Sequence, residues 1–303
     1  MRKFIKYFLG IATLTFSFSF VNTAYSLDLV FSEDRPDLRT LDPRITQSRH
    51  EEMLIVNIFD QLIAADANGN HYPGLAKKWD VSSDGLEYTF HLRDDVTFHD
   101  GTKFNAAAVK ATFDSIVDPA TGSQGAVDIL GPYASTEVID EYTAKVVFNR
   151  RYGSALTAFT ETELSIVSPT ALEKLGNEGF GMAPVGTGPF KFKNWEANKK
   201  VELVRNDDYN WAPEYMDGSG PSQVSTLTYR LIKDTSTRVA ALEAGEVHIA
   251  ELVPPLDMRR FDASGDLNTI TGTVSGLPYA AFLNTTVGVF QDINVRKAFF
   301  HSL

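Results

Sequence analysis

The 303-residue sequence contains no cysteine. This absence excludes disulfides, thiolate metal sites, a cysteine nucleophile and a lipid-modified amino-terminal cysteine. Positive charge is also scarce, because 28 Lys and Arg residues stand against 39 Asp and Glu residues and give a formal net charge of −11. Nucleic-acid binding needs clustered Lys and Arg against the phosphates. The charge balance therefore argues against a nucleic-acid partner and favours a soluble monomer.

Long apolar runs are missing beyond the first 26 residues. There, a positively charged beginning at Arg2–Lys6 is followed by the uncharged apolar stretch Phe8–Val21 and by small residues within Ala24–Ser26. This three-part pattern predicts a cleaved export signal peptide over 1–26. An uncleaved anchor helix is the alternative, but the apolar stretch is shorter than the roughly 20 residues that a membrane span needs. We expect a periplasmic protein that is not lipid-anchored.

Recognisable catalytic and metal-binding motifs are missing as well. The six histidines form no HExxH, HxH or i, i+4 pair, and no GxSxG nucleophile elbow is present. Gly186-Thr187-Gly188 resembles part of a phosphate loop, but it lacks a third glycine, and Pro189 removes a backbone donor. These absences favour a binding protein without metal or cofactor over an enzyme, although catalytic residues need not be close in sequence.

The spacing of apolar residues predicts a mixed α/β fold. Helical periodicity extends from Arg49 to Ile63, and another helix follows Asn105, which is placed to cap it. Phe190–Trp195 and Val201–Arg205 predict a β-hairpin. Further strands are expected around Leu29–Phe31, Leu86–Leu92, Ser225–Leu231 (a central strand), Val247–Ile249 and Leu277–Leu283, and further helices over Asp234–Ala244 and Asn294–Leu303.

Short motifs follow one another in order from about residue 28 to residue 303. They include Asn57-Ile58-Phe59-Asp60-Gln61-Leu62, Pro73-Gly74-Leu75-Ala76, Ser83-Asp84-Gly85-Leu86, Phe98-His99-Asp100-Gly101, Gly186-Thr187-Gly188-Pro189-Phe190, Arg205-Asn206-Asp207-Asp208-Tyr209, Gly245-Glu246-Val247-His248-Ile249 and Phe282-Leu283-Asn284-Thr285. With these motifs the sequence resembles the extracellular solute-binding proteins of the peptide/nickel family, which serve ABC importers. It departs from the family pattern at His248, where Asp is usual.

The resemblance implies an α/β, two-lobe periplasmic binding protein of the type II, class C-like kind, with its first lobe split into two subdomains. Residues 27–253 would form that first lobe, and 254–303 the crossover and the beginning of a truncated second lobe. Members of the family are much longer, and the helix pattern at the end of this sequence stops without an exit signal. We therefore expect the sequence to cover the amino-terminal part of such a protein, with the second lobe largely missing.

The resemblance also implies a function. The protein would be the substrate-binding component of an ABC importer, capturing a peptide or another small solute in a hinged cleft and delivering it to a membrane permease with its ATPase. Dipeptide, oligopeptide, nickel complex, haem, opine and sugar remain open as ligands. A secreted hydrolase and a chaperone-like protein on a related scaffold are the alternative functions.

The resemblance places ligand contacts on two segments at the lobe boundary. One is Asp37-Leu38-Arg39-Thr40, after the first strand, and the other is the crossover Glu251-Leu252-Val253. Asp37 or Glu251 is suited to an ammonium group and Arg39 to a carboxylate, while an exposed strand edge can pair with a peptide backbone. Solvated loop charges are the alternative interpretation of these residues. The Gly186–Pro189 motif is interpreted as a tight structural turn.

Overall fold

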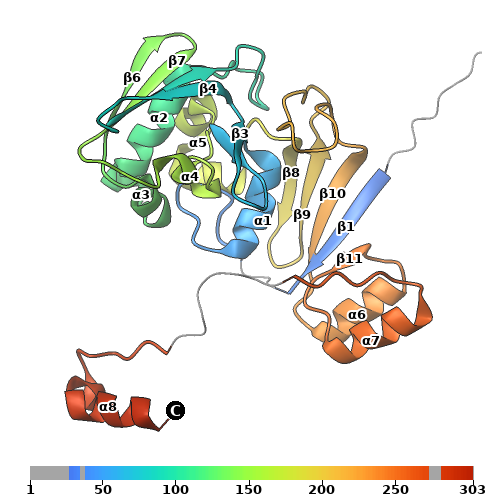
Figure 1. Cartoon of the computed structure of the whole chain (residues 1–303). Helices are drawn as coiled ribbons and strands as arrows, with labels where there is room; N and C mark the ends of the chain where they lie inside the picture. Colours follow the sequence, from blue (N-terminus) through green and yellow to red (C-terminus); the bar gives the residue numbers. More distant parts are fainter. Residues whose placement is uncertain (1–26, 35–37, 273–280, 303) are drawn as a thin grey trace, which may run out of the picture. The chain divides into compact units, whose positions relative to one another are not determined.

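The computed structural model describes residues 27–34, 38–272 and 281–302 (Figure 1). The chain divides into two compact units, Met1–Val253 and Pro254–Leu303. Helices and strands are interspersed along it, which confirms the mixed α/β class, whereas the assignment of the units to lobes stays a prediction. None of the helices in the described ranges is long and apolar enough to cross a bilayer. The predicted signal peptide lies outside the described residues.

A five-stranded sheet with the order β11-β1-β10-β9-β8 forms one half of the first unit. β1 (Leu27–Glu33) runs parallel to both of its neighbours, β10 (Val224–Leu231) and β11 (Ile249–Ala250). The antiparallel hairpin of β8 (Phe190–Glu196) and β9 (Lys200–Arg205) continues the sheet, as its sequence predicts. In Figure 1 the blue β1 lies beside the orange β10, so the sheet joins segments far apart in the sequence.

The helix α1 (Arg49–Ile58) shares a core with this sheet. Leu54, Ile55 and Ile58 on its inner face are fully buried and belong to the same cluster as Leu203 of β9. Helical periodicity continues to Ile63 in the sequence, but the helix itself ends at Ile58. The chain is extended from Phe59 onward, with φ −127° and ψ 157°.

The Gly186–Pro189 motif explains this early end. The N–H of Gly188 donates to the carbonyl oxygen of Ile58 at 2.9 Å, so the last helical carbonyl is bound by a segment from far along the chain. A Cβ atom at Gly186 would collide with the same carbonyl oxygen, and one at Gly188 would lie 2.6 Å from the Ile58 carbonyl carbon. Only glycine permits this approach of two backbones, which supports the structural interpretation of the motif.

A second core surrounds a four-stranded antiparallel sheet in the other half of the unit. Its order is β4-β5-β7-β6, with the bounds β4 (Ala76–Val81), β5 (Glu87–Leu92), β6 (Tyr133–Asp140) and β7 (Thr143–Phe148). Phe90 of β5 packs edge-on against Phe159, with ring centroids 4.9 Å apart. The helix α2 (Ala106–Val117) covers this sheet, and the Asn105 side chain accepts from the N–H of Ala108 at 3.1 Å, which confirms the predicted cap.

The remaining elements connect or extend these halves. In the first unit they are β2 (Ile63–Ala65), β3 (His71–Pro73), α3 (Gly125–Leu130), α4 (Ala155–Ala158), α5 (Pro169–Met182) and α6 (Thr235–Glu243), together with the short 3-10 turns Pro119–Thr121 and Thr162–Leu164. The second unit contains α7 (Pro255–Ser264), a 3-10 turn at Gly288–Gln291 and α8 (Ile293–His301). Of the strand predicted over Leu277–Leu283, residues 277–280 lie outside the described ranges, and 281–283 are irregular.

Candidate functional site

Three parallel strands end at one edge of the five-stranded sheet. Glu33, the last residue of β1, pairs with Leu231 of β10, and Ser32 pairs with Ala250 of β11. Directly after β11, the N–H of Glu251 donates to the carbonyl oxygen of Ser32 at 3.1 Å. Open α/β sheets bind their ligands outside the carboxyl ends of parallel strands. The structure therefore singles out this edge, to which the predicted crossover segment belongs.

Four titratable side chains meet at the edge, and we refer to Glu33, Asp34, His50 and Glu251 as the edge cluster. Glu33 is fully buried, and its Oε2 lies 3.9 Å from Nδ1 of His50 in the first turn of α1. Asp34, His50 and Glu251 each offer one oxygen or nitrogen atom that could bind a cation, and these three atoms lie within 4.8 Å of one another. Three chain segments, the ends of β1 and β11 and the beginning of α1, thus supply one polar cluster.

The edge cluster is short of hydrogen-bond donors. Both carboxylate oxygens of Glu33 are buried without a partner among the residues that the structure describes. Within the same ranges, Oδ1 of Asp34, Nδ1 of His50 and Oε2 of Glu251 are also buried and unpartnered. Such groups are uncommon in native proteins because the lost hydration is not replaced.

Glu33 responds to these surroundings by retaining its proton. Burial in the first place, and then the negative charges of Glu251 and Asp34, raise the pKa of its carboxyl group to about 8. The hydroxyl group of Tyr229 in β10 lies in the same surroundings. Its pKa is raised by burial and, once Glu33 has ionised, by the negative charge of Glu33. Below about pH 8 the cluster therefore lowers its own repulsion by keeping one carboxyl neutral.

The first turn of α1 connects the edge cluster to the segment that follows β1. Next to His50, the buried carboxylate of Glu51 accepts from the N–H groups of Arg39 at 2.8 Å and Thr40 at 3.4 Å. Its other oxygen accepts from Oγ1 of Thr46 at 2.7 Å. Glu51 thus holds the backbone of residues 39–40, and the adjacent His50 approaches Glu33. The helix α1 therefore links the segment after β1 to the edge cluster, which includes Glu251 of the crossover segment.

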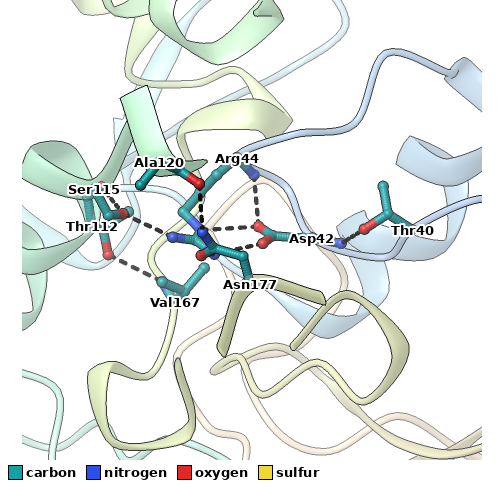
Figure 2. A network of polar contacts seen from close by, with 8 residues as sticks. All are labelled: Thr40, Asp42, Arg44, Thr112, Ser115, Ala120, Val167 and Asn177. Carbon is teal, nitrogen blue, oxygen red and sulfur yellow. Dashed lines mark hydrogen bonds and ion pairs between the residues drawn. The ribbon is translucent and has the colours of Figure 1, made fainter. Parts of the chain in front are cut away.

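A buried network fixes the rest of that segment, as Figure 2 shows. Arg44 and Asp42 form an ion pair of 2.6 Å between Nη2 and Oδ2, and both side chains are fully buried. Arg44 also donates to Oγ of Ser115 in α2 and to Oδ1 of Asn177 in α5, each at 3.1 Å. Thr40 joins the network by accepting from the N–H of Asp42 at 3.0 Å. The segment is therefore a rigid support rather than a free loop.

The ligand contacts predicted after the first strand differ from one another in their exposure to solvent. Leu38 is half-buried and packs against the core beneath α1, whereas the side chain of Arg39 is exposed. Thr40 is buried so closely against the backbone of Gly181 that a Cβ atom there would collide with Oγ1 of Thr40. Asp37 lies outside the described residues. For this segment, ligand contact stays a prediction.

The crossover residues are held by a buried arginine. Arg238 of α6 donates from Nε to the carbonyl oxygen of Glu251 at 2.9 Å and from Nη2 to that of Leu252 at 3.3 Å. Leu252 adopts a left-handed conformation, with φ 51°, and its side chain is 61% exposed. Glu251 and Val253 are half-buried. Ligand contact by Glu251, Leu252 and Val253 likewise stays a prediction.

Sequence reasoning missed four residues of this region: Glu33, Asp34, His50 and Glu51. A signal for the first two exists, because two adjacent acids stand at the end of an apolar strand, which is a common position for ligand contacts in α/β proteins. His50 and Glu51 carry no such signal, since they fit the polar face of an amphipathic helix equally well.

Comparison with known proteins gives the family. The family model described as bacterial extracellular solute-binding proteins, family 5 Middle, matches residues 70–303. The chain belongs to this family. It is 30% identical over 290 residues to the glutathione-binding protein GsiB of Escherichia coli O1:K1, an alignment that covers 96% of this chain and 54% of that protein. The resemblance carried by the sequence motifs is thereby confirmed.

Two solved structures are similar as well. The periplasmic binding protein DppA of Helicobacter pylori, in complex with the peptide STSA, matches with a TM-score of 0.68 and 30% identity over 78% of this chain and 48% of its own. NikA of Brucella suis, in complex with Fe(III)-EDTA, matches with a TM-score of 0.71 and 27% identity over 91% of this chain and 54% of its own. The chain thus spans about half the length of these relatives.

Proposed function

We propose that this protein is the periplasmic substrate-binding component of an ABC importer. It captures a peptide or a similarly small polar solute and delivers it unaltered to a permease and its ATPase. The strand topology at the edge cluster carries the proposal, because a small-solute site is expected outside the carboxyl ends of parallel strands. Family membership supports a solute-binding role. The relatives bear the names of binding proteins, which supports this function over a secreted hydrolase or a chaperone-like protein.

The proposed mechanism is hinged capture. Residues 27–253 supply one lobe, the segment from residue 254 begins the crossover to the other lobe, and a solute that touches both faces stabilises the closed state. Only differential affinity shifts this equilibrium, so contacts must come from both lobes. From the lobe described in detail, the exposed guanidinium of Arg39 suits a solute carboxylate and Glu251 suits a solute cation.

The relatives narrow the class of solute. GsiB is named for glutathione, the DppA structure holds the peptide STSA, and the NikA structure holds an Fe(III)-EDTA chelate. All are small, polar and charged. A short peptide, a peptide-like conjugate or a small metal chelate is therefore the solute class that we propose for this protein.

The test is to identify what the intact protein carries. The protein is purified from its own periplasm and examined by native mass spectrometry, and the released small molecules are then returned to the stripped protein in a calorimetric titration. We expect one class of small polar solute that binds at equimolar ratio and keeps its mass after incubation. Conversion of the solute into products would establish the hydrolase instead, and suppression of aggregation without any bound solute would establish the chaperone-like function.

A further inference from the structure

The edge cluster differs from the other buried acids of the first unit. Asp42 is paired with Arg44, and Glu51 accepts three hydrogen bonds. Glu33, although equally buried, accepts none from the described residues. A buried carboxyl group without donors, aimed at an imidazole 3.9 Å away, indicates that part of the site is supplied from outside these residues.

The buried arginine beside the crossover does not satisfy the cluster. Arg238 approaches the crossover, but it donates to the backbone carbonyl oxygens of Ile232, Glu251 and Leu252. The carboxylate oxygen Oε2 of Glu251 remains buried without a partner in the described ranges. The arginine thus positions the crossover backbone and leaves the carboxylate available.

The spacing of the cluster fits a small positive group. Three atoms no more than 4.8 Å apart leave a point within about 2.8 Å of each, which is the length of a charge-assisted hydrogen bond. A primary ammonium has three N–H donors for these three acceptors. Carboxylate oxygen with imidazole nitrogen is also a ligand set that divalent transition metals accept.

We propose that Asp34, His50 and Glu251, with Glu33 behind them, bind a compact cation that belongs to the transported solute. The cation is either a primary ammonium group or a chelated divalent metal ion. This inference rests on the proposed function, since it names the chemical class of the solute that the importer component takes. Because the three acceptors come from the ends of β1 and β11 and from α1, the bound cation also joins three separate segments.

The first arm of the test uses metal ions alone. Zn²⁺, Ni²⁺ and Mn²⁺ are titrated calorimetrically into the intact, solute-free protein and into Asp34→Asn, His50→Gln and Glu251→Gln. If the cation is a metal, each substitution weakens binding about tenfold or more. The matched control is Glu178→Gln, which removes an exposed acid of α5 and leaves the affinity unchanged.

The second arm uses amines. A pool of dipeptides and tripeptides, and the same pool with acetylated amino groups, are offered to the same variants, and retained masses are read by native mass spectrometry. If the cation is an ammonium, the protein retains free amines over acetylated ones by about tenfold or more, and the three cluster variants lose this preference. Glu178→Gln again retains it.

The outcomes separate this inference from the proposed function. If metal affinity and amine preference survive all three substitutions, the cation site is wrong. If the protein still retains peptides, whether free or acetylated, the importer function stands. Failure to retain any small solute counts against the function itself. Misfolding is excluded by thermal unfolding without ligand, in which Asp34→Asn and Glu251→Gln keep or raise the midpoint, since each removes a like charge.

Discussion

Two acids of the first unit, the half-buried Asp60 and the fully buried Glu33, have opposite surroundings. Asp60 accepts from Oγ1 of Thr187 at 2.8 Å, the Tyr209 hydroxyl at 3.1 Å and Nε1 of Trp211 at 3.0 Å. Burial raises its pKa, while these hydrogen bonds oppose the rise. Glu33 has no such donors in the described part of the chain. The contrast teaches that hydrogen-bond donors, and not withdrawal from solvent alone, distinguish these two acids.

The largest effect should come from breaking a satisfied charge. Arg44→Ala leaves Asp42 buried and unpaired and removes the links to α2 and α5. We expect the free energy of unfolding to fall by about 4 kcal/mol, measured by urea denaturation with a circular dichroism readout. Lys110→Ala is the control, because its pair with Asp114 is partly exposed, and should cost less than about 1 kcal/mol. Equal losses in both variants would contradict the interpretation of the network.

Asp60→Ala should cost slightly less, about 3 kcal/mol, because three buried donors lose their acceptor. Asp60→Asn retains one oxygen and should lose only part of this stability. The same denaturation experiment compares the two variants. A loss below about 1 kcal/mol in Asp60→Ala would mean that these donors find water or other acceptors, and the contrast with Glu33 would weaken.

Glu33→Gln should act in the opposite direction. With its pKa raised from 4.5 to about 8, Glu33 keeps its proton in the folded state and loses it in the unfolded state, so stability declines as the pH rises from 4.5 to 8. The variant cannot lose a proton and should be more stable by at least about 2 kcal/mol at pH 8, with no difference below pH 4. Denaturation of both proteins between pH 4 and pH 9 measures this difference. A variant less stable than the wild type at pH 8 would show that Glu33 is stabilised by a partner.

The smallest effect on stability is expected at Arg39, whose side chain is exposed. Arg39→Ala should change the free energy of unfolding by less than about 0.5 kcal/mol. If Arg39 meets a solute carboxylate, the same variant should bind the co-purified solute about tenfold more weakly in a calorimetric titration. Thr40→Ala, at the buried neighbouring residue, should show the reverse: a lower free energy of unfolding and an unchanged affinity for the solute. Unchanged solute affinity in Arg39→Ala would remove it from the proposed site.

The sequence predicts the features that depend on neighbouring residues. The Asn105 cap, the β8–β9 hairpin and the interior position of β10 follow from local patterns and are all confirmed. The end of α1 at Ile58 is missed, because the group that binds its carbonyl is the N–H of Gly188, which no local pattern reveals.

The site is predictable only in part, for the same reason. The family resemblance directs attention to Glu251, but its meeting with Asp34 and His50 depends on parallel pairing of β1 with β11. Parallel pairing leaves no turn signal between the partners in the sequence. The missing donors around Glu33 appear only when every neighbour has been placed.

The position of β1 between two parallel partners has a consequence for folding. Leu27 pairs with Val224 and Phe31 with Ile249, so the first strand of the unit must wait for its last strands before either edge is covered. Such distant pairing makes closure of the sheet a slow, late event. The acids after β1 and β11 therefore come together only when the whole unit has folded. Occupancy of that edge by a ligand would report that the newly made protein has matured.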